Sequence, residues 1–281
     1  MKLYTRVEPG TSTVRISFED SVFVLGSCFA DAIGARLRNA GMDACVNPFG
    51  TLYNPLSIAK AIKRLESGEP FTVEDCVLMG AGAGLVCSFW HHTSFARAAA
   101  EEFLENANAS LSQASLKWKS CNKVIISLGT VWSYFHNGQV VSNCLKLPQA
   151  EFQRKALSLE QTTAVLKEIV DGNPDKEFIF TVSPIRHLAD GAHANQLSKA
   201  TLLLAVQDVL GPGREYFPAY EILLDELRDY RFYAEDLAHP SHVAEEYIWE
   251  NFISFAVPED QRERIAENLK QWRHSQHRPM H

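Results

Sequence analysis

The chain has 281 residues, of which 46% are hydrophobic and 22% charged, with 15 glycines and 12 prolines. These proportions are typical of a globular protein, and they exclude collagen-like, coiled-coil and wholly disordered classes. The formal net charge is −7, and the sequence contains no run of basic residues. We therefore expect neither nucleic acid nor a membrane surface as a partner, and the oligomeric state stays open.

The first eight residues carry three charges, and no later window approaches the roughly 18 uninterrupted apolar residues of a membrane span. We therefore expect a cytoplasmic protein. Its six cysteines include no Cys-x-x-Cys pair, so we expect reduced thiols and neither a zinc clip nor a redox dithiol.

Short apolar runs alternate with helical patterns along most of the chain, which predicts an α/β fold with a doubly wound parallel sheet. We expect one domain over residues 1–281, with an inserted helical and short-strand region around residues 70–120 and a polar tail at 274–281. The strands are expected at residues 22–25, 43–46, 123–128, 177–182 and 214–217. The helices are expected at residues 29–40, 58–65, 94–113, 158–171, 194–209, 219–228, 241–255 and 258–272.

Polar residues follow the predicted strands, at the edge of the sheet where such folds bind ligands. Ser27 follows the first strand, and Asp236 and His239 follow the last. A spacing of three places a carboxylate beside an imidazole within one turn, where it can fix the tautomer of the ring and stabilise its protonated form. In the order Ser27, Asp236, His239 these residues predict a nucleophile, the residue that orients the base, and the base.

Residues 24–30, Val-Leu-Gly-Ser-Cys-Phe-Ala, resemble the signature that names the GSCFA family, a branch of the SGNH or GDSL-like hydrolase superfamily. Residues 236–241, Asp-Leu-Ala-His-Pro-Ser, resemble the last block of that superfamily. The similarity covers about residues 20–255 and includes residues 47–54, 129–130, 183–187 and 230–236. It implies a flavodoxin-like three-layer fold and ester chemistry, with Ser27 as nucleophile, His239 as base and Asp236 as the orienting carboxylate.

The sequence departs from the superfamily at its third block, where an asparagine usually follows the glycine by two residues. Here Val131 takes that place, so the oxyanion hole must be assembled differently. We expect its donors among the backbone N–H groups of Ser27 and Gly50, the Thr130 hydroxyl or backbone, and the Asn54 amide.

Other residues are weaker candidates. Cys28 adjoins Ser27, but we expect it in the core, because two consecutive residues leaving a strand should not both face the ligand-binding crevice at the edge of the sheet. His91, Arg186 and His187 are candidate substrate contacts, although a packed histidine is the simpler reading of His91. The spacing of His187, Asp190 and His193 fits a metal triad, but no fourth ligand is evident, and we expect no metal or cofactor.

Three functions remain open from the sequence. The first is a serine esterase or deacylase that acts on a small-molecule or glycan acyl ester. The second is an O-acyltransferase that uses the same acyl-enzyme, and the third is a non-catalytic flavodoxin-like module that binds a small ligand. The sequence has no dinucleotide fingerprint that would favour the third.

Overall fold

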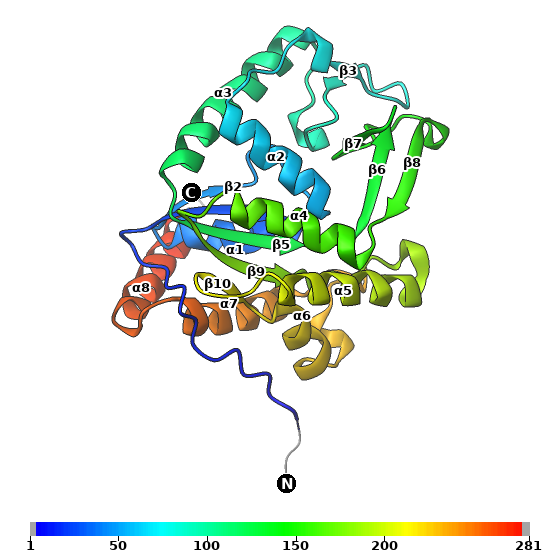
Figure 1. Cartoon of the computed structure of the whole chain (residues 1–281). Coiled ribbons are helices and arrows are strands. Elements are labelled where there is room, and N and C mark those ends of the chain that lie inside the picture. The colour runs from blue at the N-terminus through cyan, green and yellow to red at the C-terminus, as the bar shows by residue number, and fades with distance from the viewer. Residues whose placement is uncertain (1–3, 277–281) are drawn as a thin grey trace, which may run out of the picture.

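A five-stranded parallel sheet lies at the centre of the computed structural model, which describes residues 4–276 (Figure 1). Its spatial order is β2-β1-β5-β9-β10, which in chain order reads 2-1-3-4-5, the flavodoxin-like arrangement. The α/β fold class predicted from the sequence is therefore confirmed. The strands are β1 (Ser21–Gly26), β2 (Asp43–Val46), β5 (Lys123–Leu128), β9 (Glu177–Val182) and β10 (Arg214–Tyr216).

Helices cover both faces of this sheet and make a three-layer structure (Figure 1). One layer holds α2 (Pro55–Ser67), α3 (Ala100–Ser120), α4 (Leu159–Asp171) and α5 (Gly191–Gln207). The other holds α1 (Cys28–Asn39), α6 (Ala219–Glu221) with the π-helical turn Ile222–Glu226, α7 (His242–Ala256) and α8 (Glu259–Gln276).

Side chains of the central strands alternate between the two layers. In β1, Val22 and Val24 pack with α1 and α7, whereas Phe23 and Leu25 pack with the opposite helices. The Phe23 ring meets Trp118 of α3 edge to face, with 5.1 Å between the ring centroids. All four β1 side chains are fully buried, as expected for a strand that is covered on both faces.

Two small antiparallel sheets are added to this framework. The first is a hairpin of β3 (Val77–Leu78) and β4 (Val86–Cys87), within the region where we expected an insertion. The second has the order β7-β6-β8, formed by β6 (Trp132–His136), β7 (Gln139–Val141) and β8 (Phe152–Ala156). This second sheet was not predicted, because its short strands carry charged and polar residues and show no clear alternation. Short 3₁₀ turns are Val73–Asp75, Thr93–Phe95, Gln149–Glu151, Leu188–Asp190 and Tyr230–Phe232.

Two predicted boundaries move in the structure. The helix expected at 94–113 is α3, which begins at Ala100, ends at Ser120 and packs against β1 as an ordinary crossover. Residues 274–276, expected in a polar tail, continue α8, and residues 277–281 lie outside the described part of the chain. Within residues 4–276, no helix combines the length and the apolar character that crossing a bilayer requires.

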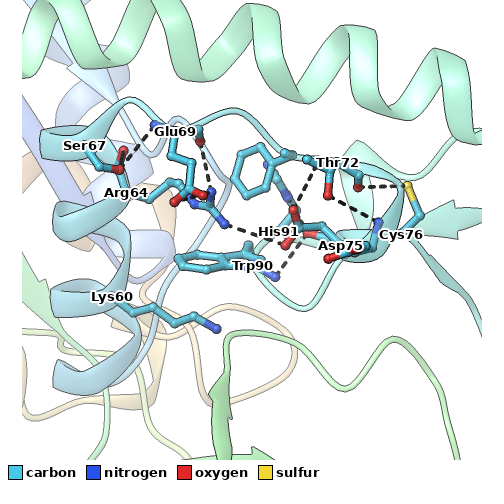
Figure 2. Close-up of polar contacts among 12 residues, drawn as sticks. Lys60, Arg64, Ser67, Glu69, Thr72, Asp75, Cys76, Trp90 and His91 are labelled. Carbon is cyan, nitrogen blue, oxygen red and sulfur yellow. Dashed lines mark hydrogen bonds and ion pairs between the residues drawn. The ribbon is translucent and has the colours of Figure 1, made fainter.

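His91 lies in the core beside the hairpin, which agrees with the simpler reading of a packed histidine, and it does not line the cavity as a substrate contact would. It is fully buried, and its Nδ1 is 2.7 Å from the Ser88 hydroxyl. Figure 2 shows this cluster, in which Arg64 of α2 reaches toward Trp90 and Asp75. Four phenylalanine rings surround the imidazole, those of Phe49, Phe71, Phe95 and Phe103.

This packing makes folding sensitive to acid. Burial lowers the pKa of His91 from 6.5 to about 3, and the charge of Arg64 adds to the effect. As the pH falls, the unfolded chain takes up the proton before the folded chain does. The stabilisation is therefore complete above about pH 6.5 and is lost progressively as the pH falls toward 3.

We expect His91→Phe to weaken this acid sensitivity. The new phenylalanine ring fits among its neighbours but cannot bind a proton. When the pH is lowered from 7 to 5, the free energy of unfolding should therefore fall by about 2 kcal/mol less in the variant than in wild type. Urea unfolding at both pH values measures the difference. Equal losses in the two proteins would show that His91 does not control this pH dependence, whatever the stability of the variant at pH 7.

Candidate functional site

Ser27 lies at the junction between β1 and α1 and is nearly fully buried. Its backbone is extended, and its hydroxyl caps α1 by accepting a hydrogen bond from the Phe29 N–H at 3.3 Å. The hydroxyl is also 3.0 Å from the hydroxyl of Ser127 in β5. The serine is therefore held at the carboxyl edge of the sheet, at the end of β1, by contacts to the neighbouring strand β5 and to its own helix.

Asn47 and Asp31 fix the turn around this serine. The Asn47 side chain accepts a hydrogen bond from the Gly26 N–H at 2.8 Å and donates one to Asp31 at 2.7 Å. Burial raises the pKa of Asp31, whereas the hydrogen bond from Asn47 opposes that rise. Asp31 thus does more than compensate the helix dipole, because it orients the amide that holds the end of β1.

The loop that follows the 3₁₀ turn Tyr230–Phe232 carries His239 and Asp236, as the spacing predicted. Oδ2 of Asp236 is 2.6 Å from Nδ1 of His239, and Oδ1 accepts hydrogen bonds from the N–H groups of His239 and Ala238 at 2.9 and 3.0 Å. The two backbone bonds and then the imidazole lower the pKa of Asp236 to about 2. The carboxylate is therefore ionised at neutral pH and orients the ring, although both side chains are about half exposed.

Ser27 and His239 line the same cavity, which has a volume of about 630 Å³. The cavity lies where β1, β5 and β9 end, and the small sheet of β6 to β8 forms one wall. Within residues 4–276, the Ser27 hydroxyl bonds to Ser127 and Phe29 and makes no bond to His239. The remaining residues of the wall include Cys28, Tyr53, Asn54, Thr130, Trp132, Tyr134, Arg154, Arg186, His187 and Asp190.

Arg186 and His187 meet this cavity, where we expected a substrate contact. His187 donates its backbone N–H to the side-chain oxygen of Asn195 at 2.9 Å. Burial, followed by the nearby charge of Lys199, lowers the pKa of His187 to about 4, so its imidazole is neutral at pH 7. The two adjacent residues therefore bring one cation and one neutral ring to the wall.

Two of the four expected oxyanion donors are already engaged. Gly50 does not line the cavity, and its N–H donates to the Asn47 carbonyl at 2.8 Å to close a turn. The Ser27 N–H donates to the Ser127 carbonyl at 3.1 Å, as an extension of the pairing between β1 and β5. These two N–H groups already donate to backbone carbonyls, one in a neighbouring strand and one in a turn, and such contacts cannot be read from the sequence.

Thr130 and Asn54 do line the cavity, and they differ in what they can still donate. The Thr130 N–H donates to the Tyr53 carbonyl, and its hydroxyl pairs with Ser198 at 3.1 Å. Asn54 caps α2 through its oxygen, which accepts from the Ser57 N–H at 2.9 Å. Its amide NH₂ has no acceptor among residues 4–276, so Asn54 is the best placed of the four predicted donors.

Cys28 also lines the cavity, which corrects the expectation that only one of residues 27 and 28 could do so. Ser27 has extended backbone angles and Cys28 is already helical, so the rule of opposite faces for consecutive strand residues does not apply at this junction. Its thiol is 3.4 Å from the Tyr53 hydroxyl. Burial and then this contact raise the pKa of Tyr53 to about 12.

Lys199 of α5 is a buried basic residue behind the site, and it was not predicted from the sequence. Its Nζ donates to the carbonyls of Gly129 at 2.8 Å and Ser183 at 2.7 Å, which ties together the ends of β5 and β9. Burial, followed by the charge of Arg186, lowers the pKa of Lys199 to about 7. The available signal was a lysine at position 199, just before the apolar run 202–206. A charged residue on a buried helix face needs a polar partner.

The spacing that suggested a metal triad has another explanation. Asp190 forms a two-point ion pair with Arg154 of β8, in which one N–O distance is 2.6 Å. This pair lowers the pKa of Asp190. Within residues 4–276, no three His, Cys, Asp or Glu side chains are grouped as they would be around a metal ion.

We expect Gly26→Ala to destabilise the protein, because a Cβ at Gly26 would lie 2.1 Å from the Ser127 carbonyl oxygen at a φ of +136°. The loss should be roughly 2–4 kcal/mol in free energy of unfolding, measured by urea denaturation. Gly138→Ala is the matched control, since Gly138 has a φ of +79° but open space around it. Equal losses in both variants would mean that backbone strain alone, and not the close approach to β5, requires glycine at position 26.

A sequence model described as the GSCFA family matches residues 21–252 of the chain. The match includes Ser27, Asp236 and His239 together with all five strands of the central sheet. No curated protein sequence matches.

Proposed function

Because the chain belongs to the GSCFA family and brings a serine and a carboxylate-oriented histidine to one cavity, we propose that it is a serine hydrolase that removes small acyl groups from esters. The observation that carries this proposal is the pairing of Asp236 with His239 beside the cavity that Ser27 lines. Membership of the SGNH or GDSL-like superfamily, which the resemblance implies, is part of the same proposal.

The proposed reaction begins when the Ser27 hydroxyl rotates from Ser127 toward Nε2 of His239. Oγ attacks the acyl carbon while Nε2 takes its proton, and the ester C–O bond then breaks as the leaving alkoxide receives that proton. Water repeats the two steps on the acyl-enzyme and releases the free acid. Asp236 holds the ring with Nδ1 protonated and stabilises the imidazolium between the steps.

The negative charge on the tetrahedral intermediate needs donors beside Ser27. The NH₂ of Asn54 is one, and the N–H of Cys28 is a second, because neither has an acceptor among residues 4–276. Cys28 is the first residue of α1, so the positive end of the helix dipole also faces this point. Removing one such donor from a serine hydrolase typically costs about 10²- to 10³-fold in rate.

The exposure of the base favours hydrolysis over acyl transfer. His239 and Asp236 are each about half exposed, so water can reach the imidazole that would activate it. A transferase that uses the same acyl-enzyme must keep water away from this group until the acceptor binds.

We expect a fluorophosphonate probe to label the wild-type protein and not Ser27→Ala, since the probe reacts with an activated serine. Ester turnover should fall by at least about 10³-fold in that variant. Loss of the capping hydroxyl should cost only about 1 kcal/mol of stability. Mass spectrometry of the labelled peptide and hydrolysis of 4-nitrophenyl acetate are the measurements.

Cys28→Ala is the matched control for this experiment, because it removes the neighbouring nucleophile from the same cavity. The control should keep the label on Ser27. Labelling that persists in Ser27→Ala and disappears in Cys28→Ala would instead identify the thiol as the nucleophile.

We expect Asp236→Asn to lower kcat by roughly 10²- to 10⁴-fold, because an amide can hold the ring in the wrong tautomer. The measurement is kcat for an activated ester at neutral pH, with the folding of both proteins checked.

The control is Asp229→Asn, which removes an exposed carboxylate that pairs with Arg231 in the same segment of chain. This variant should keep the wild-type kcat. A kcat that is the same in wild type and Asp236→Asn would remove Asp236 from the proposed mechanism.

A further inference from the structure

The cavity wall contains more positively charged than negatively charged side chains. Two arginines, Arg154 and Arg186, line it, but Asp190 is the only carboxylate in the wall within residues 4–276. Asp190 is fully engaged with Arg154 through a two-point ion pair. Arg154 is further held by the Trp132 ring, whose centroid is 4.1 Å from the guanidinium carbon.

Arg186 is left as the cation without a carboxylate partner in the described part of the chain. Within residues 4–276, no carboxylate forms an ion pair with its guanidinium, and its Nε is buried without a hydrogen-bond partner. Its positive charge reaches the interior, because it lowers the pKa of Lys199 and opposes the rise in the pKa of Tyr220. A buried donor without an acceptor is costly, so this guanidinium is suited to donate hydrogen bonds to a ligand oxygen.

The position of Arg186 relative to the reacting groups is fixed by the backbone. Its N–H donates to the carbonyl of Ala238 at 3.0 Å, the residue immediately before His239. The nearby carboxylate of Asp236 does not compete for the guanidinium, because its two oxygens accept from the His239 ring and from two backbone N–H groups. Arg186 is therefore attached to the loop that carries the base, and its charge is free for a ligand in the same cavity.

We propose that Arg186 binds an acidic group of the substrate, a carboxylate or a phosphate, while Ser27 and His239 act on an ester elsewhere in the same molecule. The planar guanidinium matches two oxygens of either group. His187 lies in the same wall with a neutral imidazole, so it adds no second positive charge for the ligand. This inference rests on the proposed hydrolase function, and it narrows the substrate to acidic esters in a protein whose own net charge is −7.

The test compares acidic esters with neutral partners in which the acidic group is methylated. The first pair is 3-acetoxybenzoate and its methyl ester, with the acid on the leaving group. The second pair is 4-nitrophenyl succinate monoester and its methyl ester, with the acid on the acyl group. A third substrate, 3-acetoxyphenyl phosphate, replaces the carboxylate of the first by a phosphate and distinguishes the two acidic groups.

For at least one acidic substrate, the kcat/KM of wild type should be about tenfold or more above its kcat/KM for the neutral partner of that substrate. One charge-assisted contact provides a gain of this size. For 3-acetoxyphenyl phosphate, the neutral partner is methyl 3-acetoxybenzoate. In Arg186→Gln the ratio of acidic to neutral substrate should fall to within about twofold of one, and Arg186→Lys should keep part of it. Arg273→Gln removes an exposed charge in the last turn of α8, outside this cavity, and should keep the wild-type ratio.

The outcome can be separated from that of the hydrolase proposal by equilibrium binding. If no ester is hydrolysed, the hydrolase proposal fails, and calorimetric titration of Ser27→Ala with 3-acetoxybenzoate, 3-acetoxyphenyl phosphate and methyl 3-acetoxybenzoate still tests Arg186. Tighter binding of an acidic compound that is lost in the double variant Ser27→Ala/Arg186→Gln supports the inference. Ratios at or below one for every acidic substrate in wild type, or ratios that Arg186→Gln leaves unchanged, would overturn it.

Discussion

The contact between the end of β1 and β5 is the constraint on which the rest of the site depends. Gly26 approaches the Ser127 backbone so closely that no side chain fits, and this approach lets the Ser27 N–H extend the pairing of the two strands. The chain then turns into α1 with the Ser27 hydroxyl between its own helix and Ser127. The other groups of the site are arranged around this serine.

The neighbouring strand ends are held by hydrogen bonds from buried polar groups. Lys199 donates to the first carbonyls after β5 and β9, and the Tyr53 carbonyl accepts from both Gly129 and Thr130. These bonds satisfy backbone groups at the point where the regular sheet pairing stops. As a result the cavity floor is rigid, whereas the groups proposed to move protons lie on the half-exposed loop of Asp236 and His239.

The small sheet of β6 to β8 decides the electrostatics of the cavity. Without Arg154, Asp190 would be free to neutralise a neighbouring cation, and the wall would have no unbalanced charge. The ion pair between Arg154 and Asp190 joins residues 36 positions apart and occupies both charges. The cation that remains is Arg186, so an element remote from the reacting serine shapes the substrate preference that we propose.

The sequence by itself was enough to predict the order of the central strands and their helices, the position of Ser27 and the pairing of Asp236 with His239. These features depend on local patterns, since the two residues of the pair are only three positions apart and each apolar run specifies its own strand. Only the tertiary structure decided which N–H groups stay free, which of the two readings of His91 holds, and that Lys199 and Arg154 lie at the site. Those outcomes depend on contacts such as Ser27 with Ser127 and Lys199 with Gly129, which join residues 100 and 70 positions apart, and the packing of distant elements is not encoded in any short stretch of sequence.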